Sequence, residues 1–183
     1  MRGFFGIGVE DISKPQNAGN LMRSAHAFGA SFFFAVRPDI DFHGLRQSDT
    51  SEAAFHMPFY EYDSPEALTL PRGCRLVGVE FLPDAEDLPS FRHPLQAAYV
   101  FGPEKGNLSP GLLARCDAVV KIPTKFCVNV GVAGALVMYD RMIALGNQAE
   151  RMVGTRAALT KKPAPKDRKS LINGDSSLPT QVV

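Results

Sequence analysis

Short apolar runs alternate with polar segments along the first 147 residues. Residues 3–9 form an apolar, β-prone run, and residues 31–36 form another. Between them, residues 17–29 repeat apolar positions at helical spacing. A strand, a helix and a strand in such quick succession predict a βαβ unit, which is typical of an α/β fold with a parallel sheet.

The same alternation of apolar runs and polar segments continues through the rest of this region. It predicts strands at 57–61, 75–81, 97–102 and 117–123, helices at 64–69, 109–115 and 129–147, and a loop at 82–95. The last helix is apolar through Val132, Leu136, Tyr139 and Ile143. Residues 37–58 have no clear period, apart from a short helix expected at 51–55.

Charge divides the 183 residues into two parts. Residues 1–150 hold 13 basic and 17 acidic residues, a net charge of −4, whereas residues 151–183 hold 7 basic and 2 acidic residues, a net charge of +5. Apolar periodicity also ends near residue 150. We expect one domain over 1–150 and a basic, disordered tail over 151–183, which serves either as an arm for a polyanion or only as a solvated end.

The cysteines and histidines argue against a disulfide framework and a metal centre. Cys74, Cys116 and Cys127 are odd in number and lack CxxC spacing, and the four histidines lack metal-ligand spacing. The longest apolar runs fall far short of the ~20 residues that span a bilayer. These features predict a cytoplasmic protein that uses neither a membrane nor a metal.

The first motif with chemical potential is NAGNLMRSAHAFG at residues 17–29. Gly19 follows Asn17 closely at the predicted helix start, where a phosphate or cofactor can approach the backbone. Arg23 lies six residues after Asn17 and could share the same edge of the helix mouth. The alternative is a capping asparagine with a solvated surface arginine.

Two further motifs follow predicted strands. In YVFGPEKGNLS at 99–109, Glu104 lies in a tight turn at the carboxyl end of a strand, where open α/β sheets bind ligands. In IPTKFCVNVGVAGALVMYD at 122–140, Asn129 begins a helix rich in small residues that can pack closely on a neighbour or a cofactor. An ordinary turn and plain helix packing are the alternatives.

Taken in this order, the three segments resemble motifs 1, 2 and 3 of the SpoU group of the SPOUT methyltransferases. The matching residues are Asn17, Gly19, Arg23, Ala25, Phe28 and Gly29; Phe101, Gly102, Pro103, Glu104, Gly106, Leu108 and Ser109; and Ile122, Pro123, Asn129 and Val130. The resemblance covers residues 3–147. It departs from the family in Cys127 and Gly131, which replace two serines of motif 3, and in a loop of only three residues between Pro123 and Cys127.

The resemblance implies a parallel α/β SPOUT fold whose C-terminal part forms a deep trefoil knot, and a homodimer built through the knot region. It implies S-adenosylmethionine as cofactor and methylation of a ribose 2′-hydroxyl in tRNA or rRNA. The catalytic set would be Arg23, Asn17, Glu104 and Asn129, and the cofactor would contact Val79, Gly102, Ile122, Cys127 and Val130.

Roles within that set follow from the chemistry of methyl transfer. The resemblance implies that Arg23 acts as a general base together with an RNA phosphate, which is chemically difficult because a guanidinium is effectively never deprotonated in proteins. An equally economical role is to clamp the target phosphate and stabilise the developing alkoxide. Glu104 would hold the ribose or Arg23, and Asn17 and Asn129 would fix the mouth of the pocket.

The altered third motif leaves two other functions open. One is an RNA-binding dimer with little or no activity, and the other is a SPOUT enzyme that methylates a base nitrogen. Cofactor titration separates the first from an active enzyme, and nucleoside mapping of the product separates the second. The complete set of Asn17, Arg23, Glu104 and Asn129 favours ribose methylation.

Overall fold

The structure is a computed structural model that describes residues 3–42 and 57–146. These residues form β1 (Phe4–Glu10), α1 (Pro15–Ala27), β2 (Phe32–Val36), β3 (Phe59–Tyr62), β4 (Arg75–Val79), β5 (Glu86–Asp87), the 3₁₀ turn η2 (Leu88–Ser90), β6 (Gln96–Phe101), α3 (Pro110–Leu113), β7 (Ala118–Lys121) and α4 (Val130–Leu145). The helix expected at 51–55 and the tail at 151–183 lie outside the described residues.

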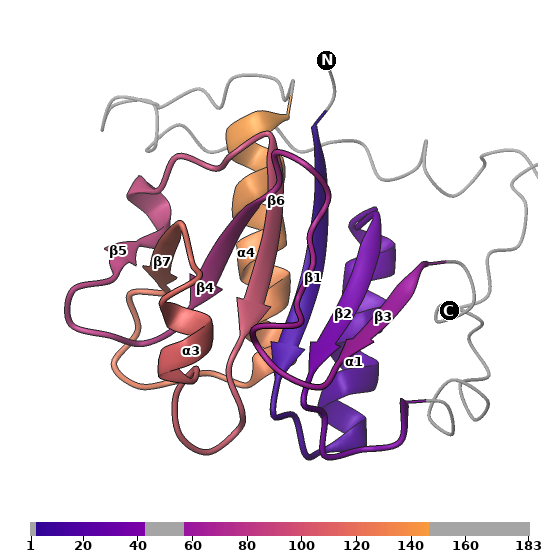
Figure 1. Ribbon diagram of the computed structural model, residues 1–183. Helices are drawn as coiled ribbons and strands as arrows, with labels where there is room; N and C mark the ends of the chain where they lie inside the picture. Colours follow the sequence, from indigo (N-terminus) through magenta and orange to yellow (C-terminus); the bar gives the residue numbers. More distant parts are fainter. Residues whose placement is uncertain (1–2, 43–56, 147–183) are drawn as a thin grey trace, which may run out of the picture. The chain divides into compact units, whose positions relative to one another are not determined.

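The strands form a seven-stranded sheet in the order β3-β2-β1-β6-β4-β7-β5, and every neighbouring pair is parallel. The chain leaves β1 toward β2 and leaves β6 toward β7, in opposite directions, so the sheet has its topological switch point between β1 and β6. The helices α1 and α4 lie side by side on one face (Figure 1). The predicted α/β class with a parallel sheet is confirmed, and the trefoil knot stays a prediction.

Alternate side chains along the strands fill two cores, as the two-residue period of a strand requires. Ile7, Val9 and Phe33 point to the face covered by α1 and α4. Phe32 and Phe34 point to the opposite face, where they join the buried residues of the segments around α3. Both faces of the inner strands are therefore apolar, which explains their continuous apolar runs.

Two glycines of β1 make room for two phenylalanine rings of β2. Gly6 lies opposite Phe32 in the sheet register, and Gly8 lies opposite Phe34. A Cβ atom at Gly6 or Gly8 would approach ring atoms of the facing phenylalanine to 2.3 Å and 2.2 Å. The rings therefore lie directly over the β1 backbone, and any larger residue at either glycine would displace them.

The prediction of a helix at 64–69 is wrong, because this segment forms only a hydrogen-bonded turn. Its backbone carbonyls are used by side chains from elsewhere in the chain. Arg115 donates to the carbonyls of Pro65 and Leu68, and the Tyr62 hydroxyl donates to the Thr69 carbonyl at 2.8 Å. The loop expected at 82–95 also contains regular structure, since it includes β5 and η2.

The apolar series that predicts the last helix lies on its exposed face. Val132, Leu136, Tyr139 and Ile143 are between 39% and 51% exposed. The buried face carries small residues in its first half and larger ones further along: Gly131, Ala133, Gly134, Val137, Met138 and Arg141. Gly134 packs so closely that a Cβ atom would lie 2.1 Å from the Leu21 side chain. Across residues 3–42 and 57–146, α4 and the other helices are too short or too polar to cross a membrane.

A buried polar cluster fixes the second half of α4 to the amino end of the sheet. His93 Nδ1 lies 2.6 Å from the Tyr99 hydroxyl, and His93 Nε2 lies 2.9 Å from Asp140 Oδ2. Arg141, which is 5% exposed, donates to Tyr99 Oη and to the carbonyls of Phe4, Pro94 and Leu95. This pattern suits a neutral His93 that accepts from Tyr99 and donates to Asp140.

We expect the stability of the protein to fall in mild acid because of His93. Burial lowers the pKa of His93, although its hydrogen bond to Asp140 opposes the shift. The unfolded chain takes up this proton near pH 6.5, so it binds more protons than the folded state below that pH. The free energy of unfolding should therefore decrease from about pH 6.5 down to the lower pKa of folded His93.

Urea denaturation between about pH 5 and 7.5 measures this slope. His93→Gln, which can still accept from Tyr99 and donate to Asp140, should flatten it. Equal slopes for the wild type and His93→Gln would contradict the assignment.

Candidate active site

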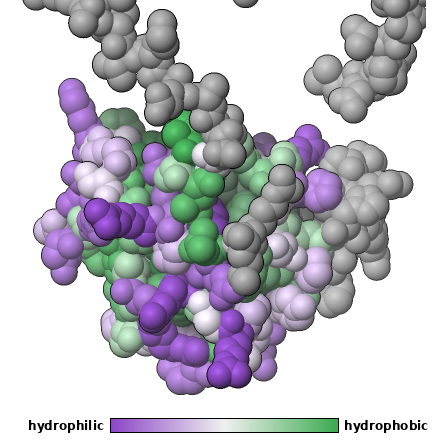
Figure 2. All heavy atoms as spheres, turned by 90° about the horizontal axis from the view of Figure 1, so that it is seen from above, coloured by the Kyte–Doolittle hydropathy of each residue, from purple (hydrophilic) through white to green (hydrophobic). Residues whose placement is uncertain are grey.

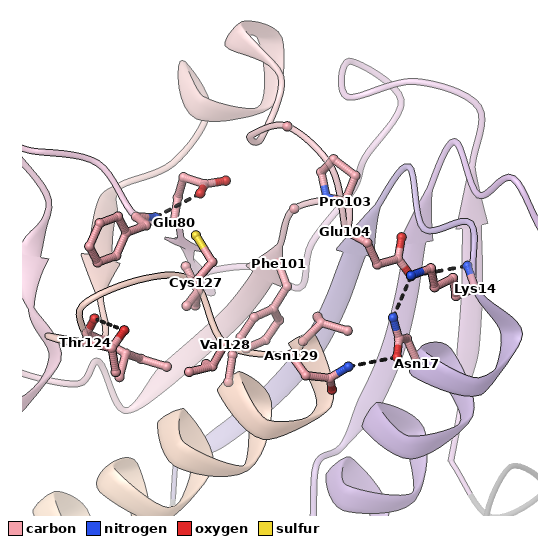
Figure 3. A pocket seen from close by; sticks show the side chains of 17 residues that line it. Lys14, Asn17, Glu80, Phe101, Pro103, Glu104, Thr124, Cys127, Val128 and Asn129 are labelled. Carbon is pink, nitrogen blue, oxygen red and sulfur yellow. Dashed lines mark hydrogen bonds between the residues drawn. The ribbon is translucent and has the colours of Figure 1, made fainter.

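A cavity of about 350 Å³ opens where the carboxyl ends of β4, β6 and β7 meet the first turns of α1 and α4. This volume lies within the range of small-ligand pockets. Its lining comprises Lys14, Asn17, Val79, Glu80, Phe81, Phe101, Gly102, Pro103, Glu104, Gly106, Ile122, Thr124, Cys127, Val128, Asn129, Val130 and Ala133 (Figure 3).

All the residues predicted to form the site, apart from Arg23, line this cavity. They meet because the carboxyl ends of parallel strands lie at one edge of the sheet. Arg23 lies on α1 six residues beyond Asn17, about 9 Å further along the helix and about a third of a turn round it. Its side chain is exposed and lies outside the lining of the pocket in its own chain.

Three of the predicted residues form one hydrogen-bonded chain across the pocket mouth (Figure 3). Asn129 Nδ2 donates to Asn17 Oδ1 at 2.9 Å, and Asn17 Nδ2 donates to Glu104 Oε1 at 2.9 Å. Asn129 Oδ1 in turn accepts from the Gly131 amide, which caps the first turn of α4. The three sequence motifs are therefore joined by direct contacts between their polar side chains.

Glu104 is an ionised acceptor at the centre of this mouth. Besides Asn17, its carboxylate accepts from the Ser13 amide and hydroxyl and from the Lys14 amide. Burial raises the pKa of Glu104, but the hydrogen bonds from Asn17 and Ser13 outweigh it and lower the pKa below its ordinary value. The group therefore holds no proton to give at neutral pH.

Two carboxylates that the sequence analysis missed hold the loop between β6 and α3. Glu80 Oε2 accepts from the Leu108 amide at 2.8 Å, and Glu10 accepts from the Ser109 amide and hydroxyl at 2.7 and 2.6 Å. Gly102 lies so close that a Cβ atom there would be 2.9 Å from Glu80 Oε2. The available signal was an acidic residue at the carboxyl end of an apolar strand, which is found at both positions.

The cysteines differ in their surroundings. Burial raises the pKa of the Cys74 and Cys116 thiols to about 11, which leaves them protonated and unreactive near neutral pH. Cys127 is exposed and lies in the pocket lining beside Val128. Across the part of the chain that the structure describes, His, Cys, Asp and Glu form no cluster of three or more that could hold a metal ion.

A family model and several known proteins match this chain. The model of the SpoU rRNA Methylase family matches residues 5–139. A tRNA (guanosine(18)-2′-O)-methyltransferase of Thermus thermophilus is 28% identical in an alignment of 140 residues that covers 72% of this chain and 71% of that protein. A mouse tRNA (guanosine(18)-2′-O)-methyltransferase is 26% identical over 137 residues, but these are only 9% of its length.

Solved structures agree with the fold. A structure described as giving insights into the 2-OH methylation of C/U34 on tRNA has 26% identity and a TM-score of 0.64, and covers 78% of this chain and 91% of that chain. The SpoU methyltransferase AviRb of Streptomyces viridochromogenes with AdoMet has 23% identity and a TM-score of 0.66, and covers 76% of this chain and 57% of that chain. The second likeness shows the fold alone.

We expect Glu104→Gln to lower the free energy of unfolding by about 1–2 kcal/mol, because the glutamine –NH₂ would face amide donors that now have an acceptor. Urea denaturation near pH 7 measures the change. Glu86→Gln, on the exposed strand β5, is the matched control and should change stability by less than about 0.5 kcal/mol. Equal stability of the two variants would contradict the bridging role of Glu104.

Proposed function

Because the family model matches residues 5–139, the chain belongs to the SpoU rRNA Methylase family, and we propose that it transfers a methyl group from S-adenosylmethionine to a ribose 2′-hydroxyl of tRNA or rRNA. The observation that carries this proposal is the hydrogen-bonded set of Asn17, Glu104 and Asn129 at the mouth of a pocket. The relatives of known activity support the reaction and the kind of substrate.

The lining of the pocket fits a nucleoside-type cofactor. Val79, Phe101 and Ile122 provide apolar walls, while Gly102 leaves a space beside Leu108 that a Cβ atom would fill. Val79, Gly102, Ile122, Cys127 and Val130 would hold the cofactor, as the sequence motifs imply. When bound, S-adenosylmethionine supplies an electrophilic methyl group on a sulfonium, so the reaction needs no metal.

The residues of the chain would position the hydroxyl and stabilise the charge that develops on it. Asn17 and Asn129 hold each other and Glu104 in fixed orientations at the mouth, so the site is organised before RNA arrives. Arg23 would bind a phosphate of the RNA beside this mouth and stabilise the alkoxide as the hydroxyl proton leaves. Its place outside the pocket lining fits contact with the substrate rather than with the cofactor.

The altered third motif keeps the geometry of its helix start. Gly131 replaces a family serine, yet its amide is still bound by Asn129 Oδ1 at 2.9 Å. Cys127 still lines the pocket, where a small polar side chain is expected. These contacts favour an active enzyme over an RNA-binding protein without cofactor.

The second copy in the proposed homodimer would cover the exposed side of α4. Val132, Leu136 and Ile143 lie on that side, and each is at least 39% exposed. Figure 2 shows further hydrophobic surface in the view from above, onto the end of the sheet where α4 ends. The exposed fractions of Leu95, Met142 and Leu145 are 40–56%. Apolar side chains in one row on a helix that borders the site are typical of an interface.

We expect Arg23→Ala to lower the rate of methyl transfer by roughly 10²–10⁴-fold while leaving folding and cofactor binding intact. The measurement is kcat with saturating RNA and cofactor, with the product mapped as a 2′-O-methylated nucleoside. Arg72→Ala, at another exposed arginine, is the control. Activity of Arg23→Ala within threefold of the wild type would contradict the role proposed for Arg23 in methyl transfer. A base-methylated product would overturn the proposed reaction.

Leu136→Lys should convert the proposed dimer to a monomer, because it places a charge in the middle of the apolar row on α4. Sedimentation velocity measures the oligomeric state, and circular dichroism checks that the variant is folded. Tyr60→Lys, at an exposed side chain on the end strand β3, should leave the dimer intact. A wild-type monomer at about 100 μM would contradict the dimer.

A further inference from the structure

Glu80 is a pocket carboxylate that the proposed reaction does not use. It follows β4 directly and lines the cavity together with Cys127 (Figure 3). Its Oε1 accepts from the Phe81 amide at 2.8 Å, and its Oε2 accepts from the Leu108 amide at 2.8 Å. Each oxygen therefore has one protein donor, although a carboxylate oxygen can accept two.

The other pocket carboxylate, Glu104, already accepts as many hydrogen bonds as its oxygens can. Glu104 Oε1 accepts from the Lys14 amide and Asn17, and Glu104 Oε2 accepts from the Ser13 amide and hydroxyl. Both oxygens of Glu104 thus have two protein donors, whereas each oxygen of Glu80 keeps one acceptor position open. Glu80 is therefore the carboxylate better able to respond to a bound ligand.

The charges around the cavity do not cancel. Its charged lining residues are Lys14, Glu80 and Glu104, which give a net charge of −1 when all are ionised. Among the described residues Glu80 accepts backbone hydrogen bonds only and forms no ion pair with Lys, Arg or His. A carboxylate in a partly enclosed cavity acts on a ligand charge several ångströms away, because salt screens it less than it screens a surface charge.

We propose that Glu80 makes the pocket selective for a cationic ligand, and so favours S-adenosylmethionine over its demethylated product. The inference rests on the proposed function for the identity of the cofactor. S-adenosylmethionine carries a net charge of +1 through its sulfonium, whereas S-adenosylhomocysteine is a neutral thioether of otherwise equal structure. Loss of the positive charge during transfer would then weaken binding of the product and speed its release.

The test compares three ligands by isothermal titration calorimetry with the full chain. They are S-adenosylmethionine, S-adenosylhomocysteine and sinefungin, an unreactive analogue with an ammonium in place of the methyl sulfonium. In Glu80→Gln the affinity for the two cationic ligands should fall about tenfold more than the affinity for S-adenosylhomocysteine. Glu86→Gln, the same change on exposed β5, should leave all three affinities unchanged.

The ratio of affinities separates charge from structure. Glutamine also disturbs one of the two amide contacts, and this structural change would lower the affinity for all three ligands equally. An equal loss of affinity for the three ligands, or no loss, would overturn the inference. Glu80→Asp keeps the charge and should keep the ratio within threefold, and it carries the test if Glu80→Gln does not fold. A wild-type protein that binds none of the ligands would overturn the proposed function itself.

Discussion

Carboxylates that accept backbone amides hold the segment between β6 and α3 from three directions. Glu10 from β1 binds the Ser109 amide, Glu80 from β4 binds the Leu108 amide, and Glu104 within the segment binds amides at the start of α1. Such charge-assisted bonds are stronger than neutral ones, and here they connect three separate strand ends. The pocket has its shape because this segment cannot move relative to β1, β4 and α1 without breaking them.

A second set of polar contacts fixes α4 at the opposite edge of the sheet. Arg141 donates to the carbonyls of Phe4 and Leu95, next to the amino ends of β1 and β6. At the other end of the helix, Asn129 is bound to Asn17. The helix is therefore fixed at both ends, while Gly134 between them allows close contact with Leu21.

Local patterns predicted the described strands except β5, together with polar residues of the candidate site, because these depend on short-range features. The residues expected to contact the cofactor came only from the family resemblance. A buried parallel strand appears as an apolar run, and polar residues just after such runs meet at one sheet edge, as Glu104 and Asn129 do. The turn at 64–69 could not be predicted, because Arg115, far along the chain, takes its carbonyls. Whether Arg23 faces the pocket depends on how α1 is rotated about its axis against the sheet, and the spacing of Asn17 and Arg23 within one motif does not define that rotation. Glu80 was missed because its partner Leu108 lies 28 residues away.

The helix α4 contributes both to the pocket and to an exposed apolar surface. The first turn of this helix contributes Asn129, Val130 and Ala133 to the cavity, and its outer side carries the apolar row that includes Leu136. A molecule that binds this outer side and one that binds in the cavity contact the same rigid element. Thermodynamic linkage then requires reciprocity: if one ligand tightens the binding of the other by some factor, the second tightens the first by the same factor. If the molecule on the outer side is a second copy of the chain and its binding alters the pocket, the affinity of the pocket depends on protein concentration.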